Sequence, residues 1–254
     1  MQVNGEAIMA KEGAILALVV LLGIKGQSLL PICVQALYNM TSASDHFKGI
    51  ERIIKALLNM SSVGFDYSDF LVKALVNCAR YSWLRLRIIE DGGISSLHGL
   101  LPNLVAAENR SELVFNMLSA LRSLSESSGC RAEMLLKGSV ELLNGLLPYS
   151  DEKDKLLIIK VLHNFLQTPL SLSLSAFETA ANISYTIVAE TNFISTVQYC
   201  AACFHIITRE KLRGLRHLST VIINAMSILL KSDDAITQFF GISAAGNLFF
   251  GNLV

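Results

Sequence analysis

The sequence is poor in charged residues and in residues that break helices. Only 17% of its 254 residues are charged whereas 52% are hydrophobic, and it contains 4 prolines and 16 glycines. In a soluble protein, so high an apolar fraction means that most helices are buried on more than one face. Few helix breakers favour long helices over many short strands. The length suffices for one large domain or two small ones.

Neither sign of charge is in excess, because 21 Lys and Arg balance 21 Asp and Glu. A protein that binds nucleic acid through its phosphates carries a basic excess, since counterion release supplies much of the affinity. We interpret the one local basic stretch, Arg209 to Arg216, as a solvated turn between helices. No nucleic-acid partner is therefore predicted.

The sequence also lacks a hydrophobic run of transmembrane length. Its longest apolar run, Ala14 to Ile24, is about half of the ~20 residues that a spanning helix requires. Glu6 and Glu12 do not suit the positively charged start of a signal peptide. We expect a buried repeat helix here and no membrane insertion.

Cysteines are too few for a disulfide framework, and their number, five, is odd. Free thiols fit a reducing compartment, which predicts a cytoplasmic location, with the nucleus as the alternative. Cys200 and Cys203 have the i, i+3 spacing that could begin a zinc or redox site. A second such pair is missing, and Cys203 falls where other repeats have a core leucine. We therefore predict buried packing, with no metal and no cofactor.

Known catalytic motifs are missing as well. The sequence has no G-x-S-x-G, Walker A loop, H-E-x-x-H or glycine-rich dinucleotide fingerprint. Catalysis needs a nucleophile, a base and a stabilising group that converge in one pocket. The sequence predicts a protein that is not an enzyme.

What the sequence does contain is a repeat. A five-residue pattern (small, aliphatic, any, polar, apolar) recurs along the whole chain, first as Ala-Leu-Tyr-Asn-Met at residues 36–40. Its polar residue falls at positions 39, 77, 123, 164, 205 and 247, at intervals of 38, 46, 41, 41 and 42 residues. These intervals are close to the ~40–47 residues of armadillo and HEAT repeats.

A second element recurs in phase with the first. Gly13, Gly49, Gly92-Gly93 and Gly138 each precede apolar residues spaced i, i+3, i+4 and i+7. This spacing predicts a helix with one buried face, and glycine suits the turn before it. Each repeat is thus predicted to have a glycine turn, an amphipathic helix, a polar link and a second helix that ends in the five-residue pattern.

These motifs resemble the armadillo repeat found in β-catenin, plakophilins and importin-α. The resemblance covers nearly the whole chain as about six repeats. It implies an all-α fold, a right-handed α-α superhelix, with residues 1–254 as a single domain that is part of a longer array. The resemblance is weakest in the fifth repeat, where residues 169–175 alternate with a period of two. We expect a loop or an irregular first helix there, and the conformation of residues 168–190 stays open.

The resemblance also implies a binding site. In armadillo proteins the last helix of each repeat lines a concave groove, and its asparagines hydrogen-bond the backbone of an extended peptide. An Asn side chain suits this role because it offers both donors and an acceptor; alternatively, these residues brace neighbouring helices. The candidates are Asn39, Asn77, Ser123, Asn164, His205 and Asn247, with Gln35, Lys73, Ser119 and Lys160 one turn earlier.

The predicted function is a non-enzymatic scaffold that binds an extended polypeptide segment in this groove. An importin-α-like cargo receptor is disfavoured because the only tryptophan, Trp83, lies outside the ladder register. Lys73 and Lys160 suit acidic groups on a partner, or are ordinary solvated lysines. The other alternative is a structural subunit of a cytoskeletal or ciliary assembly that uses its ends or convex face. An apolar C-terminus, where solenoids need polar caps, predicts end-to-end self-association for a chain that is not a fragment.

Overall fold

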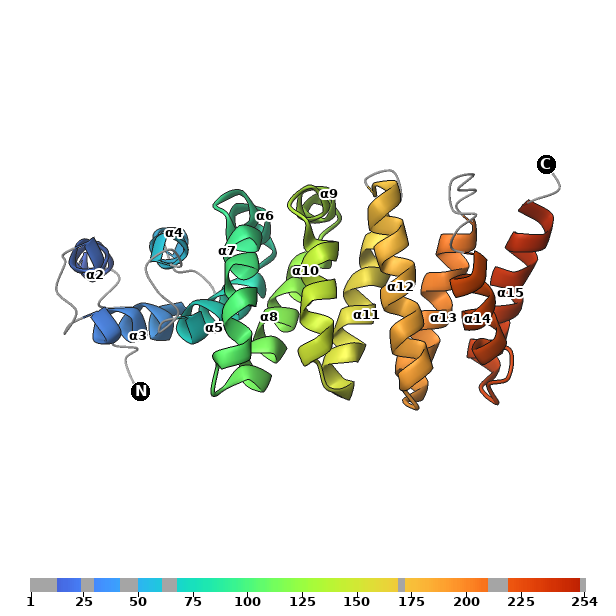
Figure 1. Ribbon diagram of the computed structural model, residues 1–254. Helices are drawn as coiled ribbons and strands as arrows, with labels where there is room; N and C mark the ends of the chain where they lie inside the picture. The colour runs from blue at the N-terminus through green and yellow to red at the C-terminus, as the bar shows by residue number, and fades with distance from the viewer. Residues whose placement is uncertain are drawn as a thin grey trace, which may run out of the picture. The chain divides into compact units, whose positions relative to one another are not determined.

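The computed structural model describes residues 13–23, 30–41, 50–60, 68–168, 172–209 and 219–251. Every regular element within these ranges is a helix (Figure 1), which confirms the all-α prediction. The chain divides into two compact units, residues 1–130 and 131–254, with the boundary inside α9 (Ser128–Leu136). The two units are described separately, and a single domain over residues 1–254 stays a prediction.

Unit 1 contains the first three repeats. In each repeat the last helix packs against its equivalent in the next repeat, so that α3 contacts α5 and α5 contacts α8. We call these last helices the ladder helices. The helices of unit 1 are α2 (Ala14–Gly23), α3 (Leu30–Thr41), α4 (Ile50–Met60), α5 (Ser68–Ala79), α6 (Ser82–Glu90), α7 (Gly93–Leu100), the 3₁₀ helix η2 (Leu101–Ala106) and α8 (Arg110–Ser125).

Unit 2 follows the same plan. Its ladder helices are α11, α13 and α15, which pack in that order, while α10 contacts α12 and α12 contacts α14 in a second layer. After α9, the helices are α10 (Ser139–Leu146), the 3₁₀ helix η3 (Leu147–Tyr149), α11 (Glu152–Leu166), α12 (Leu174–Glu190), α13 (Ile194–Arg209), α14 (Ser219–Leu229) and α15 (Ala235–Gly251).

Apolar residues of the repeat pattern form the core of both units. The aliphatic residue of the five-residue pattern is almost fully buried in each of the first four repeats, as Leu37, Leu75, Leu121 and Leu162. A single repeat cannot bury this face alone, so neighbouring repeats stabilise one another by stacking.

Glycine occupies the predicted turns for a conformational reason. Gly13, Gly92 and Gly138 have positive φ angles of 79°, 97° and 78°, in a region that other L-residues enter at a cost of about 1–2 kcal/mol. The predicted glycine turns are confirmed at these positions, whereas Gly49 lies outside the described residues. Gly93 serves another purpose: a Cβ there would lie 2.8 Å from the carbonyl oxygen of Ile88, so glycine lets α6 and α7 meet closely.

The fifth repeat is more regular than expected. Residues 169–171 lie outside the described ranges, but α12 then runs without interruption from Leu174 to Glu190. Ser173 caps it by accepting a hydrogen bond from the backbone N–H of Ala176 at 3.1 Å. Of the two alternatives, an irregular first helix is wrong, because a capped and continuous helix begins within the alternating segment. Residues 172 and 173 are not helical, as a loop requires.

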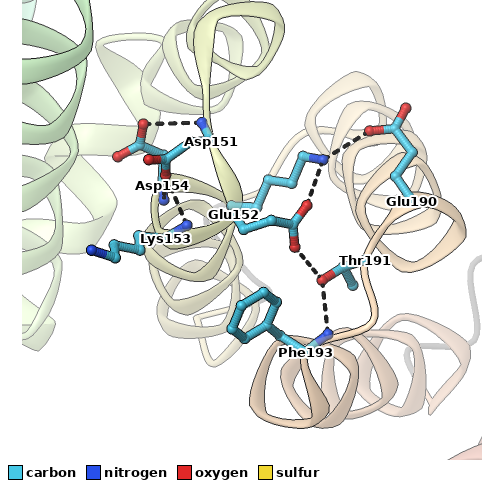
Figure 2. A network of polar contacts seen from close by, with 8 residues as sticks. Asp151, Glu152, Lys153, Asp154, Glu190, Thr191 and Phe193 are labelled. Atoms are coloured by element: carbon cyan, nitrogen blue, oxygen red, sulfur yellow. Dashed lines mark hydrogen bonds and ion pairs between the residues drawn. The ribbon is translucent and has the colours of Figure 1, made fainter.

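A network of polar contacts joins α11 to the turn between α12 and α13 (Figure 2). Lys155 Nζ lies 3.0 Å from carboxylate oxygens of both Glu152 and Glu190. Thr191 donates from its hydroxyl to Glu152 at 2.6 Å and accepts from the backbone N–H of Phe193 at 3.2 Å. Hydrogen bonds with Thr191 and Lys155 lower the pKa of Glu152. This network fixes the fourth ladder helix relative to the fifth repeat.

The predictions on membrane insertion and on the local basic stretch can be compared with the structure only where residues are described. Within the described residues, no helix is long and apolar enough to cross a membrane. Residues 210–218, which hold most of the local basic stretch, lie outside the described ranges.

Candidate functional site

The polar position of the repeat pattern, here called the rung, stays accessible on the ladder helices. Asn39 is exposed, and Asn77, Ser123, Asn164 and Asn247 are half-buried. None of these five side chains is sealed between helices. Five of the predicted rung residues are therefore not buried, three in unit 1 and two in unit 2.

In unit 1, the rung of α5 is tied to α3. Asn77 donates from Nδ2 to the hydroxyl oxygen of Thr41 at 3.1 Å. Thr41 is fully buried and donates in turn to the backbone carbonyl of Tyr38 at 2.6 Å. The amide nitrogen of Asn77 thus braces the helix stack, while its carbonyl oxygen makes no hydrogen bond within the described residues.

In unit 2, the rung of α15 is tied to α13 in the same way. Asn247 donates from Nδ2 to the hydroxyl of Thr208 and to the backbone carbonyl of His205, both at 3.3 Å. Thr208 donates to the carbonyl of Phe204 at 2.8 Å. The bracing use of Asn77 and Asn247 thus occupies Nδ2, which faces the preceding helix, while Oδ1 has no partner among the described residues.

The fifth rung lies one residue later than the sequence pattern suggests. In the other ladder helices the residue before the rung is not buried and the residue three before it is buried, except for half-buried Ala36. On α13 this pattern fits a rung at Ile206, because Phe204 and Cys203 are fully buried and His205 is not. The hydrogen bonds support the same register. Thr41 and Thr208 each accept from the asparagine of the next rung, and with Ile206 as the fifth rung both threonines lie two residues after the rung of their own helix.

His205 therefore does not occupy the rung position. The pattern Ala-Cys-Phe-His-Ile matched the repeat in polarity but not in register, because Phe204 takes the core position that leucine holds elsewhere. The rung itself is Ile206, 8% exposed, and the residue one turn earlier is Ala202, 9% exposed, rather than Ala201. In unit 2 the two asparagine rungs are thus separated by an apolar rung.

Aromatic pairs accompany the rungs in this corrected register. The residue before the rung contacts the residue seven before the rung of the next ladder helix. The pairs are Tyr38–Phe70, His163–Tyr199 and His205–Phe240, with ring centroids 5.9, 5.6 and 5.8 Å apart. The sequence analysis predicted neither these ring contacts nor the roles of Thr41 and Thr208. A sequence signal for the ring contacts does exist: an aromatic residue or histidine directly before one rung, and another seven residues before the next rung.

Lys73, one turn before its rung, is already paired. Its ammonium nitrogen lies 2.8 Å from Asp69 and 2.9 Å from Glu112 of the next ladder helix. These hydrogen bonds raise its pKa to about 12. The charge of Lys73 is therefore compensated within the protein, which leaves little attraction for an acidic partner.

Lys160, at the equivalent position of α11, is different. Its ammonium lies 5.4 Å from the centroid of the Tyr199 ring, and no carboxylate among the described residues pairs with it. A cation over an aromatic face gains about 0.5–1 kcal/mol at an exposed site and keeps its charge. Of the other residues one turn before a rung, Gln35 is exposed and Ser119 and Ser243 are half-buried.

Both histidines of unit 2 that lie beside rungs favour the neutral form. Burial lowers the pKa of His163, and the positive charge of Arg131 lowers it further. Burial and Arg209 lower the pKa of His205 in the same way, and its Nδ1 has no hydrogen-bond partner in the described residues. Neutral rings here suit aromatic contacts rather than charge recognition.

The cysteine pair of α13 is part of the core. Cys200 and Cys203 are fully buried, and burial raises the pKa of both thiols. Cys203 Sγ lies 3.9 Å from the backbone carbonyl of Ile159 on α11. In the described residues, no three His, Cys, Asp or Glu side chains come close enough to hold a metal ion. The geometry agrees with the predicted packing role.

No family model and no curated protein matches the sequence. Solved structures do match the fold. A designed armadillo repeat protein shares 16% identity, with a TM-score of 0.65, over 91% of this chain and 98% of its own. A second designed armadillo repeat protein, in complex with the peptide (KR)4, shares 15% identity with the same TM-score and coverage.

A natural armadillo protein also matches. A chain from a structure of the interaction between cadherin and β-catenin shares 12% identity, with a TM-score of 0.58, over 99% of this chain and 62% of its own. At such identities the likeness concerns the fold alone. Together with the stacked ladder helices, it confirms that this chain folds as an armadillo-type repeat protein.

Proposed function

We propose that this chain is a protein-binding scaffold whose ladder helices bind an extended polypeptide segment. The observation that supports this most directly is that the two polar atoms of the Asn77 and Asn247 side chains differ in their contacts. The amide nitrogen of each braces the preceding helix, whereas the carbonyl oxygen has no partner in the described residues. An accessible carbonyl acceptor suits the backbone N–H of a bound segment.

The fold's relatives support binding in general terms. One designed armadillo relative was solved with the peptide (KR)4, and the β-catenin structure concerns its interaction with cadherin. A basic peptide does not suit unit 2, however, because Lys160 is a cation with no carboxylate partner. An acidic side chain on the ligand would supply the missing charge.

The apolar rung of α13 restricts the chemical class of the ligand further. Ile206 and Ala202 lie between the asparagine rungs of α11 and α15 and offer no side-chain hydrogen bond. A bound segment would place an apolar side chain there and an acidic one toward Lys160. We therefore propose an acidic-apolar extended segment as the ligand of unit 2.

Selection from a phage library of random peptides tests the proposal, with the 254-residue chain as bait and fluorescence anisotropy as the measure of affinity. Enriched peptides should combine acidic and apolar residues. The double substitution Asn164→Ala and Asn247→Ala should weaken binding roughly 30-fold, because two backbone hydrogen bonds contribute about 1 kcal/mol each. Unchanged affinity in this variant would contradict the proposal.

Two controls separate binding from folding. Asn224→Ala makes the same change at an exposed position of α14 and should alter neither affinity nor stability. Thr208→Val removes the hydroxyl that accepts from Asn247 but leaves the Asn247 carbonyl in place. This variant should be less stable, and its affinity should fall by a much smaller factor than that of the double asparagine variant.

The alternative role as a structural subunit of a cytoskeletal or ciliary assembly uses other surfaces. Cross-linking to a captured partner distinguishes the two roles. Cross-links on α11, α13 and α15 fit the groove, whereas cross-links confined to α10, α12 and α14 would favour the assembly role.

A further inference from the structure

The three ladder helices of unit 2 begin at equivalent residues, but only two of them have a capping side chain there. Asp151 accepts hydrogen bonds from two backbone N–H groups in the first turn of α11. Asp234 accepts from the backbone N–H and from the hydroxyl of Thr237 at the start of α15, both at 2.8 Å. The equivalent residue before α13 is Phe193, whose side chain has no polar atom that could cap the helix.

The missing cap leaves a buried hydroxyl of α13 without a partner. Thr196 occupies on α13 the position that Thr237 occupies on α15, and both threonines are 0% exposed. The hydroxyl of Thr237 donates to the capping carboxylate of Asp234, whereas that of Thr196 has no hydrogen-bond partner in the described residues. A missing cap and an unpaired buried donor each lower stability. Phenylalanine at position 193 is therefore unfavourable for the fold.

The phenylalanine ring gains little from packing within the protein. Phe193 is 60% exposed, and the next residue, Ile194, is 62% exposed. Because α13 packs between α11 and α15, both neighbouring ladder helices are present and still leave these two side chains uncovered. A residue that breaks a local rule of folding without a gain inside the fold is expected at functional sites. Exposed aromatic residues are also enriched where proteins bind one another.

The charges beside Phe193 are acidic toward the solvent (Figure 2). Glu152 and Glu190 share a single cation, Lys155, so that two negative charges and one positive charge leave a net charge of −1. The two carboxylate side chains are 35% and 55% exposed, whereas that of Lys155 is 13% exposed. Thr191 accepts from the backbone N–H of Phe193 and donates to Glu152, which ties the start of α13 to these carboxylates. A partner that reaches Phe193 therefore meets carboxylates rather than the ammonium group.

We propose that Phe193 and Ile194, with the carboxylates of Glu152 and Glu190, form a second protein-binding surface, here called the α13 edge. Its partner is a protein that presents apolar side chains together with Lys or Arg, since these complement both the exposed apolar pair and the net negative charge. Ile206, the rung of α13, lies about 18 Å farther along the helix than Ile194. The α13 edge is thus distinct from the proposed groove and takes a ligand of the opposite charge.

Two substitutions test whether phenylalanine at position 193 costs stability. Phe193→Asn supplies a cap without adding a charge next to Glu152 and Glu190, and it should raise the Tm by about 2–6 °C. Phe193→Ala removes the ring but supplies no cap, so its Tm should stay near that of the wild-type chain. Thermal unfolding followed by circular dichroism gives both values. A Tm of Phe193→Asn at or below the wild-type value would overturn the inference, because the phenylalanine would then need no partner to explain it.

Selection of phage-displayed random peptides tests the binding itself. The 254-residue chain serves as bait, and counter-selection on Phe193→Asn removes peptides that bind elsewhere. Enriched peptides should combine apolar residues with Lys or Arg. Their affinity, measured by fluorescence anisotropy, should fall roughly tenfold or more in both Phe193 variants, because a few central side chains carry most of the affinity of an interface. It should fall by a smaller factor in Glu190→Gln, which removes one exposed charge.

Two controls keep the α13 edge apart from the groove. Leu136→Ala, at an exposed leucine of α9, should leave the affinity of these peptides unchanged. The double substitution Asn164→Ala and Asn247→Ala should also leave it unchanged, although it should weaken the groove ligands. Failure to enrich any peptide that distinguishes the wild-type chain from Phe193→Asn would overturn the inference, and so would enriched peptides that are acidic.

Discussion

The amide nitrogen of Asn77 on α5 donates a hydrogen bond to the hydroxyl of Thr41 on α3, across a distance of 3.1 Å. Thr41 uses its own proton for the carbonyl of Tyr38, so its oxygen is free to accept. The rung residue therefore stabilises the contact between two repeats. A substitution at a rung is therefore expected to change the stability of the fold as well as any binding of a ligand.

A double-mutant cycle measures this contact. Asn77→Ala and Thr41→Val each remove the same hydrogen bond and should lower the free energy of unfolding by about 1 kcal/mol. The double variant should lose little more than either single variant, as read from urea denaturation. Strictly additive losses would show that the two side chains act independently.

Two glycines of α7 should respond in opposite ways to the same substitution. Gly93→Ala would bring a Cβ within 2.8 Å of the backbone carbonyl oxygen of Ile88 and should cost about 1–3 kcal/mol. Gly99→Ala meets nothing within 4 Å and should stabilise the helix by about 0.5–1 kcal/mol. Thermal unfolding of the two variants checks this, and equal shifts would contradict it.

The Asp154 carboxylate should make the fold less stable at neutral pH. The side chain is 2% exposed, and burial raises its pKa from 3.8 to about 6, although the backbone N–H of Asp151 donates to it. A raised pKa means that the folded state binds the proton more tightly than the unfolded state. The stabilising contribution of the protonated group is thus fully present below pH 3.8 and is lost as the pH rises through about 6.

Asp154→Asn isolates this effect, because asparagine keeps an acceptor for Asp151 and has no charge. The variant should gain up to about 3 kcal/mol in unfolding free energy at pH 7.5 and much less near pH 4. Urea denaturation of both proteins at the two pH values gives the difference directly. A difference that does not vary with pH would contradict the prediction.

The hydroxyl of Thr191 should matter more than its methyl group. Thr191→Val removes the donor to Glu152 and the acceptor for Phe193 (Figure 2), and we expect a loss of about 1–2 kcal/mol. Thr191→Ser retains both contacts and should lose less. The pKa of Glu152, followed by NMR, should rise in the valine variant only; the same loss in both variants would show a packing role instead.

Much of the fold could be predicted because the repeat determines it locally. Apolar spacing located the helices, and the glycine turns were right where Gly92 and Gly138 require positive φ. The fifth repeat was harder, because Phe204 rather than the cysteine before it holds the core position of leucine. The fifth rung lies one residue after His205. A pattern of polar and apolar residues cannot detect this shift, because His205 is polar like Asn164, the rung of the preceding repeat.

The positions of the ladder residues on their helices could be predicted, but the contacts of their side chains could not. Sequence reasoning gave Lys73 and Lys160 the same role, yet Asp69 and Glu112 neutralise only Lys73. Glu112 lies in another repeat, and its distance to Lys73 depends on how α5 and α8 stack. Which charges stay available on the surface is therefore a property of the stacked repeats rather than of one motif.

The proposed ligand contact at Asn247 has a thermodynamic consequence. A ligand N–H that donates to the carbonyl of Asn247 polarises the same amide group whose nitrogen holds Thr208, and hydrogen bonds in such chains strengthen one another. Ligand binding would then tighten the joint between α13 and α15. By linkage, loosening the contact between these helices would lower the affinity for the ligand. Peptide affinity and the rigidity of the neighbouring repeats would therefore rise and fall together.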